Sequence, residues 1–136
     1  MSEHLPRTLA LQLLTEAQKS PQREVCGMIS GQGTLPKRLI PIQNIATTPE
    51  TLFEMEPQQQ IHALREIREQ GEQLWAIYHS HPQAPATPSP RDLAEAAYPD
   101  ALYLVISLNT EGVLEIRGFR LGETQFDEVA LEVTDY

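Results

Sequence analysis

The stretch LWAIYHSHPQAPATPSPRD, residues 74–92, joins a short apolar run to two histidines, a serine and an aspartate. Its first eight residues have the length and composition of a buried β-strand. Because strand side chains alternate between two faces, His79 and His81 leave the same face and Ser80 leaves the other. A proline-rich loop then leads to Asp92. Two neutral imidazoles and one carboxylate are ligands that suit zinc, and they leave the fourth tetrahedral position open for water, as in catalytic sites.

Ser89 and Asp92 also fit the start of a helix, which we predict over Arg91–Tyr98. Ser89 would be the N-cap, Pro90 the first helical residue and Asp92 the acidic residue of a capping-box-like pair. Capping is compatible with metal binding by Asp92, because the start of a helix is a rigid mount. For Ser89 the two roles compete for the oxygen lone pairs, although the hydroxyl proton can still be donated to a substrate.

Length and composition predict one soluble globular domain over residues 1–136. Hydrophobic residues make up 40% of the chain and charged residues 21%, which is ordinary for such a domain. The net charge is −9, and no block of like charges stands out, so we interpret the acidity as a solvated surface. A partner with a phosphate backbone needs a basic stripe, and we therefore expect no nucleic-acid partner. The sequence carries no indication of an oligomeric state.

Cys26 is the only cysteine, which excludes an internal disulfide and fits a reducing compartment. We interpret it as a buried strand residue, and not as a catalytic thiol or a metal ligand. The first residues, MSEHLPRTLALQLL, read as the start of a helix and show no cleavage site of a signal peptide. No apolar run approaches the roughly 18 residues of a membrane span. The sequence thus predicts a cytoplasmic protein with no membrane partner.

Hydrophobic periodicity and turn residues predict a chain of mixed helices and strands. Pro41, inside one strand candidate, indicates an edge strand or a bulge. The apolar run Leu102–Leu108 indicates a central strand that is covered on both faces. The helices are expected over Pro6–Lys19, between Pro57 and Gly71 with Ile61, Leu64 and Ile67 inward, and over Arg91–Tyr98. The strands are expected over Glu24–Ser30, Leu39–Ile45, Thr51–Glu56, Leu74–His81, Leu102–Leu108, Val113–Leu121 and Gln125–Val133, with a hairpin turn at Asn109–Gly112.

The pattern His79-x-His81, seven residues, Ser89, two residues, Asp92 resembles the signature of the JAMM (MPN+, Mov34/PAD-1-like) zinc metalloproteases. That signature includes an upstream glutamate, which matches Glu24 in the segment REVCGMISG. Further matching residues are Cys26, Gly27 and Pro82. The resemblance implies an α/β fold with three layers, α-β-α, around a mostly antiparallel mixed sheet similar to that of cytidine deaminases.

The resemblance also implies a zinc ion held by His79, His81 and Asp92, with water as the fourth ligand. Glu24 would act as the general base, taking the proton of the attacking water and passing it to the leaving amine. The Ser89 hydroxyl would stabilise the oxyanion. The segment YHSHPQAPATPSPRDLAEA is similar to the corresponding segment of bacterial stand-alone members of the family. These imply a small ubiquitin-like sulfur-carrier protein as the partner, cleaved just after its C-terminal Gly-Gly.

Two other classes of function stay open. One is a catalytically silent MPN-type scaffold or binding module, although every ligand position of the signature is filled here. The other is a zinc amidohydrolase that acts on a small non-protein amide. Other zinc hydrolases fit poorly, because the chain has no His-Glu-x-x-His motif. A nucleobase deaminase would need a Pro-Cys-x-x-Cys motif, which a single cysteine cannot supply.

Overall fold

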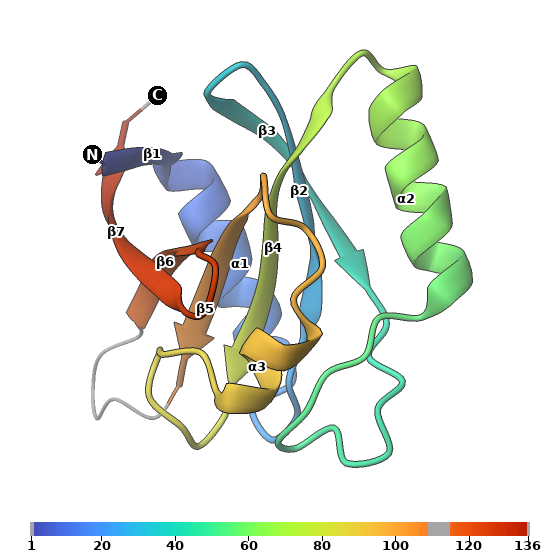
Figure 1. Ribbon diagram of the computed structural model, residues 1–136, viewed down its shortest axis with the longest axis vertical. Helices are drawn as coiled ribbons and strands as arrows, with labels where there is room; N and C mark the ends of the chain where they lie inside the picture. Colours follow the sequence, from blue (N-terminus) through green and yellow to red (C-terminus); the bar gives the residue numbers. More distant parts are fainter. Residues whose placement is uncertain (1, 109–114, 136) are drawn as a thin grey trace.

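A mixed sheet of seven strands forms the middle of the molecule (Figure 1). The structure is a computed structural model, and it describes residues 2–108 and 115–135. The strands are β1 (Ser2–Pro6), β2 (Cys26–Gln32), β3 (Leu35–Ile42), β4 (Gln73–His81), β5 (Leu102–Ser107), β6 (Glu115–Leu121) and β7 (Phe126–Thr134). Their order across the sheet is β1-β7-β6-β5-β4-β2-β3. The pairs β4–β5 and β1–β7 are parallel and the other neighbours are antiparallel, which confirms the expected mostly antiparallel mixed sheet.

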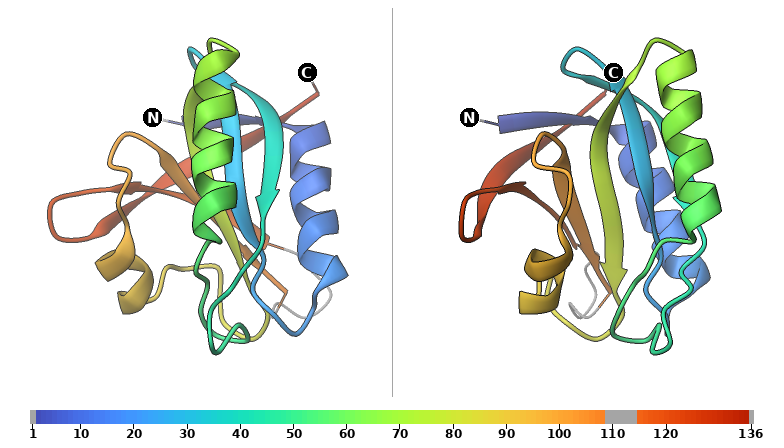
Figure 2. Two further views of the ribbon diagram at one scale, coloured as in Figure 1. Left: turned by 90° about the vertical axis from the view of Figure 1, so that its right-hand side faces the viewer. Right: turned by 45° about the vertical axis from the view of Figure 1, so that its right-hand side comes forward.

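Helices cover both faces of the sheet and complete the expected α-β-α arrangement (Figure 2). Helix α1 (Arg7–Lys19) packs on one face through a stripe of small and aliphatic side chains that recur at helical spacing. Helices α2 (Pro57–Glu69) and α3 (Pro90–Glu95) lie on the other face. No helix among the described residues is long and apolar enough to cross a membrane.

The central strand β5 shows how the sheet divides two cores. Leu104 and Ile106 face α1, while Tyr103 and Val105 face the side of α2 and α3. All of its residues are buried. This confirms the prediction that the apolar run is a strand covered on both faces.

Strand β4 carries the two histidines and changes its side-chain parity once. In the pairing with β2, Ile29 lies opposite Ala76 but Ser30 lies opposite Leu74, so Trp75 is an extra, bulged residue. After the bulge the side chains alternate regularly as far as the last residue of the strand. The two histidines therefore share the face of α2 and α3, and Ser80 takes the face of α1, as the spacing predicts.

Gly27 marks the point where β2 is squeezed between its neighbours. A Cβ atom at this position would lie 2.5 Å from the carbonyl oxygen of Ile40 and 2.5 Å from the hydroxyl of Tyr78. Only glycine leaves room for both neighbouring atoms, and this close packing explains the glycine that follows Cys26. The close packing fixes β2 against β4, and it thereby fixes the segment just before β2, which carries Glu24.

The structure differs from several of the predicted elements. Residues 2–6 form strand β1, not the start of a helix, because they pair with β7 at the far end of the chain. Segment 51–56 is a loop with a single bridge between Met55 and Asn44. Ile61 is 57% exposed, and Ala63 and Ile67 are the buried side chains of α2. Helix α3 ends at Glu95, before the predicted Tyr98. The turn predicted at 109–112 lies outside the described residues.

Candidate metal centre

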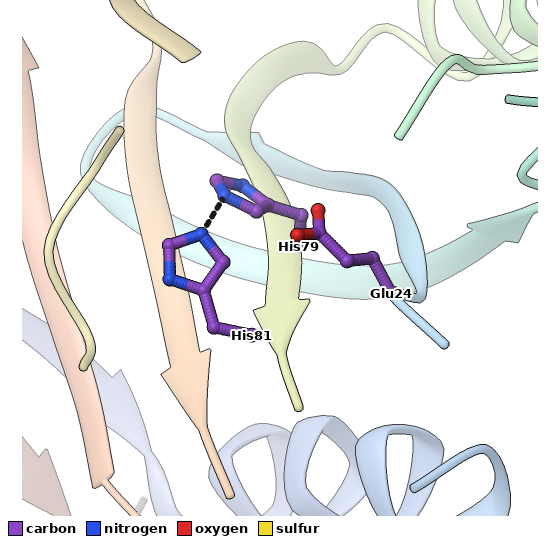
Figure 3. Close-up of side chains that lie close together, drawn as sticks. All are labelled: Glu24, His79 and His81. Carbon is purple, nitrogen blue, oxygen red and sulfur yellow. Dashed lines mark hydrogen bonds between the residues drawn. The ribbon is translucent and has the colours of Figure 1, made fainter. Parts of the chain in front are cut away.

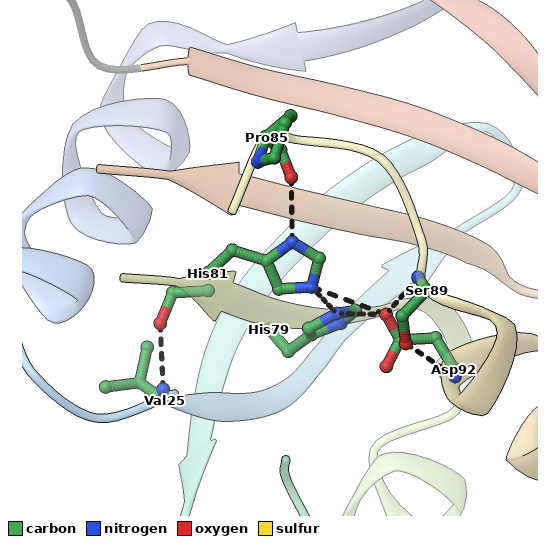
Figure 4. Close-up of polar contacts among 7 residues, drawn as sticks. Val25, His79, His81, Pro85, Ser89 and Asp92 are labelled. Carbon is green, nitrogen blue, oxygen red and sulfur yellow. Dashed lines mark hydrogen bonds and ion pairs between the residues drawn. The ribbon is translucent and has the colours of Figure 1, made fainter. Parts of the chain in front are cut away.

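His79 and His81 stand at the end of β4, and both are almost fully buried. Their Nε2 atoms are 3.1 Å apart. The Oδ2 atom of Asp92, on the first turn of α3, lies 3.1 Å from Nε2 of His79 and 3.3 Å from Nε2 of His81 (Figure 4). Strand β4 and helix α3 therefore bring the three side chains singled out in the sequence to one point.

The three atoms form a triangle whose size fits one zinc ion. Zinc bonds to imidazole nitrogen and carboxylate oxygen measure about 2.0–2.1 Å, so tetrahedral ligand atoms lie about 3.3 Å from one another. The observed separations of 3.1, 3.1 and 3.3 Å match this edge length. Two imidazoles and one carboxylate also supply the ligand chemistry that zinc prefers. The donor set thus fits a single zinc ion.

The outer nitrogen of His81 has a partner that favours ligation. Its Nδ1 atom lies 2.8 Å from the carbonyl oxygen of Pro85, in the loop after β4. A carbonyl oxygen only accepts, so Nδ1 carries a proton and, in the neutral ring, the lone pair of Nε2 faces the triangle. His79 is held differently: the ring of Phe53 stacks on it with the centroids 4.5 Å apart, and its buried Nδ1 has no hydrogen-bond partner among the described residues.

Asp92 and Ser89 form the predicted capping box at the start of α3. The backbone N–H of Ser89 donates to Oδ2 of Asp92 at 2.8 Å, and the backbone N–H of Asp92 donates to Oγ of Ser89 at 3.0 Å. The cap uses Oγ of Ser89 as an acceptor only, which leaves its hydroxyl proton available for donation. The same two bonds orient the Asp92 carboxylate toward the histidines (Figure 4).

Glu24 lies just before β2, and only 5% of its surface is exposed. Its carboxylate points toward the two imidazoles (Figure 3). One carboxylate oxygen of Glu24 and one ring nitrogen of each of His79 and His81 lie within 4.8 Å of one another, so the three residues form a group that could hold a metal ion. Oε1 of Glu24 has no hydrogen-bond partner among the described residues. An unpartnered buried carboxylate beside the triangle is costly unless a cation or a proton donor faces it.

The backbone around Glu24 is fastened to the strand between the two histidines. The N–H of Val25 donates to Oγ of Ser80 at 2.8 Å, and the N–H of Ser80 donates to the carbonyl of Val25 at 3.0 Å. The Ser80 side chain lies on the opposite face of β4 from His79 and His81. Its bonds to Val25 therefore fix the position of the adjacent Glu24 along β4, relative to the two histidines. The alternation of strand side chains predicts this face for Ser80, but nothing in the sequence indicates these bonds.

The site brings two largely buried carboxyl groups, Glu24 and Asp92, close to two imidazoles, and their pKa values show how each responds to this environment. Burial raises the pKa of Glu24 to about 8, with a lowering effect of His81 and a further raising effect of Asp92. Burial also lowers the pKa of His79, which keeps this imidazole neutral and fit for ligation. For Asp92, hydrogen bonds from both histidines outweigh the raising effect of burial and lower the pKa. A divalent ion between these groups would favour the ionised carboxylates and the neutral imidazole.

For His81 the balance of effects runs the other way. Burial lowers its pKa, but the hydrogen bonds with Asp92 and Pro85 and the negative charges of Glu24 and Asp92 outweigh this effect and raise the pKa. Its protonated form would compete with a metal ion for the Nε2 lone pair. Metal binding at this imidazole is therefore expected to release a proton.

A pocket of about 280 Å³ opens directly beside His79 and Asp92. Its walls are mainly apolar, and its mouth carries Arg91 and Glu95, which pair with each other at 2.9 Å. Arg91 is thus an exposed helix arginine at the edge of the pocket. Side chains that line the interior include those of Phe53, Met55, Tyr98, Tyr103, Val105 and Phe126.

Residues 6–121 match the family model described as prokaryotic homologs of the JAB domain. The chain belongs to this family. A JAB-family relative from Thermus thermophilus, described as a probable TtuB-protein conjugate cleaving protease, is 36% identical over 130 residues, covering 96% of this chain and 82% of the relative. The CysO-cysteine peptidase of Mycobacterium tuberculosis is 29% identical over 125 residues, covering 90% of this chain and 85% of the relative.

Solved structures agree with the family assignment. A protein from Desulfitobacterium hafniense, 28% identical, superposes with a TM-score of 0.85 and covers 98% of this chain and 93% of its own. A JAB1/MPN domain protein from Archaeoglobus fulgidus, 16% identical, shares the fold with a TM-score of 0.63 over 97% of this chain and 99% of its own. The three-layer JAMM/MPN fold is therefore confirmed. With relatives described as proteases and peptidases, this JAB-family chain is a peptidase.

Two contributors to the site were missed by the sequence analysis. Phe53 stacks on His79 from a segment that was predicted to be a strand, and an isolated aromatic residue in such a segment reads as a core residue. Pro85 contributes only its carbonyl oxygen, which every residue possesses, so its identity carries no signal. The proline density of the loop was the sole sign that its backbone is held in one shape.

Proposed function

We propose that this JAB-family peptidase uses zinc to cleave just after the C-terminal Gly-Gly of a small ubiquitin-like sulfur-carrier protein. The observation that carries the proposal is the triangle of His79 Nε2, His81 Nε2 and Asp92 Oδ2, with edges of 3.1–3.3 Å, beside the buried carboxylate of Glu24. The descriptions of the relatives support the substrate class, because one names TtuB-protein conjugates and the other CysO-cysteine as what the enzyme cleaves.

In this proposal His79, His81 and Asp92 hold the zinc ion. Bound there, zinc would act as a Lewis acid and would lower the pKa of a water molecule to about 7. Glu24 takes a proton from the attacking water and delivers it to the nitrogen of the leaving amine. The amine therefore leaves as a neutral molecule and not as an unstable anion. Burial raises the pKa of Glu24, and a bound divalent ion would lower it again, so the two effects together suit a group that must both accept and return a proton near neutral pH.

The pocket beside the triangle suits an extended tail that ends in small residues. Glycines carry no side chain, so a Gly-Gly backbone can approach Asp92 and His79 closely. The apolar walls would then accept a side chain that precedes the two glycines. Strand β3 is a sheet edge, as its proline predicts, but it contributes no residue to this pocket. We therefore place the tail in the pocket and not along β3.

A cleavage assay on carrier fusions tests the proposal. Ubiquitin-like carriers extended by a short peptide after Gly-Gly are expected to be cut at that bond by the zinc-loaded protein, with the products identified by mass spectrometry. The same fusions with Ala-Ala in place of Gly-Gly should react at least about 10-fold more slowly, because the added methyl groups obstruct the approach. Equal cleavage of both sets would contradict the Gly-Gly preference.

The same assay, run in parallel with small amides, separates the two alternatives. A protein that binds about one zinc per chain, cuts none of the fusions and hydrolyses small amides would be an amidohydrolase. A protein that hydrolyses neither class would be a scaffold and would contradict the assignment as a peptidase.

Ser89 gives a second test, because its two roles can be separated. We propose that its hydroxyl donates to the oxyanion, so Ser89→Ala should lower kcat by about 100-fold or more. The same change removes the N-cap of α3 and should cost about 1 kcal/mol of stability. Ser89→Thr keeps both the hydroxyl and the cap and should retain most of both properties. Steady-state kinetics and thermal unfolding measure the two effects, and a Ser89→Ala enzyme with nearly wild-type kcat would limit Ser89 to capping.

A further inference from the structure

The side chain of Asn44 stands at the centre of four hydrogen bonds to main-chain atoms. Its Nδ2 donates to the carbonyl of Glu24 at 2.9 Å and to the carbonyl of Leu52 at 2.9 Å. Its Oδ1 accepts from the N–H of Ala46 at 3.0 Å and from the N–H of Glu54 at 3.0 Å. A primary amide offers two donor hydrogens and two acceptor lone pairs, so all four positions are used.

These bonds join two segments that the mechanism uses and that are far apart in sequence. On one side is Glu24, whose N–H also donates to the carbonyl of Pro49 at 2.7 Å. Both main-chain groups of Glu24 are thus held by segment 44–54. Glu24 itself lies outside the regular pairing of β2, which begins at Cys26. The ladder of the sheet therefore does not hold Glu24 directly.

On the other side are Leu52 and Glu54, which flank Phe53. Asn44 bonds both neighbours, and the Phe53 ring in between stacks on His79 with the planes 22° apart. Leu52, Phe53 and Glu54 also line the pocket beside the metal ligands. Within the part of the chain that the structure describes, two main-chain bonds flank the Asn44–Met55 bridge, from Ile45 N–H to the carbonyl of Glu54 at 2.9 Å and from Glu56 N–H to the carbonyl of Gln43 at 3.0 Å. The amide side chain of Asn44 adds the bonds to the two neighbours of Phe53.

We infer that Asn44 is a positioning residue, which holds the general base Glu24 and the Phe53 wall of the substrate pocket in register with His79. The inference rests on the proposed function, because it gives Glu24 and the pocket the roles assigned there. Asn44 touches no reacting atom and acts through the backbone of Glu24 and through the residues on either side of Phe53. A single side chain thereby links the base to the pocket wall.

Two variants of Asn44 test the inference. Asn44→Ala deletes all four bonds, and Asn44→Asp keeps the size and the two acceptor bonds while it removes both donors. Both should lower kcat by about 10- to 100-fold, since a displacement of a catalytic group by about 1 Å can cost 100-fold. Zinc content should stay at that of the unaltered protein, because β4 and α3 hold the ligands independently. Asn44→Ala should also speed the amide hydrogen exchange of Glu54 and Glu24.

Gln59→Ala is the matched control. It removes one hydrogen bond to the neighbouring residue, from the N–H of Gln43 to Oε1 of Gln59 at 2.9 Å, and it touches neither Glu24 nor Phe53. Its kcat and its exchange at Glu24 and Glu54 should equal those of the unaltered enzyme. If Asn44→Ala and Asn44→Asp also turn over at the unaltered rate, the inference is overturned while the proposed function stands. If the unaltered zinc-loaded enzyme cuts no carrier, both are overturned.

A double-variant cycle with Glu24→Asp separates positioning from general loosening of the fold. Glu24→Asp shortens the side chain by one methylene group, so its carboxylate no longer reaches the position of the Glu24 carboxylate. In that background Asn44→Ala should lower kcat by less than about 3-fold, because only its support of Phe53 remains and its bonds no longer serve a well-placed base. An equal loss in both backgrounds would show that Asn44 acts independently of Glu24, and it would overturn the inference.

Discussion

Asp92→Asn is expected to remove zinc and turnover together. Asparagine has the size of aspartate and still offers an oxygen to the N–H of Ser89, so the start of α3 should be kept. The negative charge is lost, however, and with it the one anionic ligand of the proposed site, whose other two proposed ligands are imidazoles. We expect zinc to fall well below one per chain after dialysis. Turnover should fall by more than the roughly 100- to 1,000-fold that the loss of one oxyanion donor costs.

Metal analysis and carrier cleavage, measured on the same preparation, check this result. Glu69→Gln is the matched control, because it makes the same change of charge on an exposed part of α2, far from the triangle. It should keep zinc content and turnover. Thermal unfolding of the zinc-free proteins shows whether Asp92→Asn is folded. An Asp92→Asn protein that keeps one zinc and full activity would show that His79 and His81 work with a different third ligand.

The part of the site that lies within one strand and one helix start could be predicted from the sequence, because its geometry is local. Side chains two apart on a strand share a face, which placed His79 and His81 together. The capping residues predicted that Asp92 lies at the rigid start of a helix, and the capping box of α3 confirms it. Nothing local related Glu24 to these residues, and its assignment came from the resemblance alone.

The parts that could not be predicted depend on contacts between distant segments. The pairing of β1 with β7 joins the two ends of the chain, so the periodicity of residues 2–6 carried no sign of it. Segment 51–56 has apolar residues at Leu52, Phe53 and Met55, yet it is a loop. A single bridge, its flanking main-chain bonds and the side chain of Asn44 hold it to residues 43–46. A polar residue that satisfies backbone groups of two other segments has no pattern in sequence that would reveal it.

Glu24→Gln is expected to keep the metal and lose the reaction. Glutamine matches the size of glutamate, and the main-chain bonds that hold position 24 do not involve the side chain. The neutral amide should also be tolerated in this buried place, since burial disfavours the charged form of Glu24. The amide cannot accept the proton of the attacking water. The loss of kcat should therefore be that of a general acid–base group, about 100- to 10,000-fold.

Zinc content and carrier cleavage distinguish Glu24→Gln from the ligand variant. Zinc should remain near one per chain in Glu24→Gln, whereas Asp92→Asn should lose it, although both variants lose turnover. KM should change little, because the pocket walls are untouched and Glu24 does not line the pocket. If Glu24→Gln instead lost its zinc, Glu24 would be a metal ligand, as its place in a group with His79 and His81 allows. Full turnover without the carboxylate would require a different base, and none of the other described acidic side chains joins Glu24 and Asp92 at the imidazole pair with comparable burial.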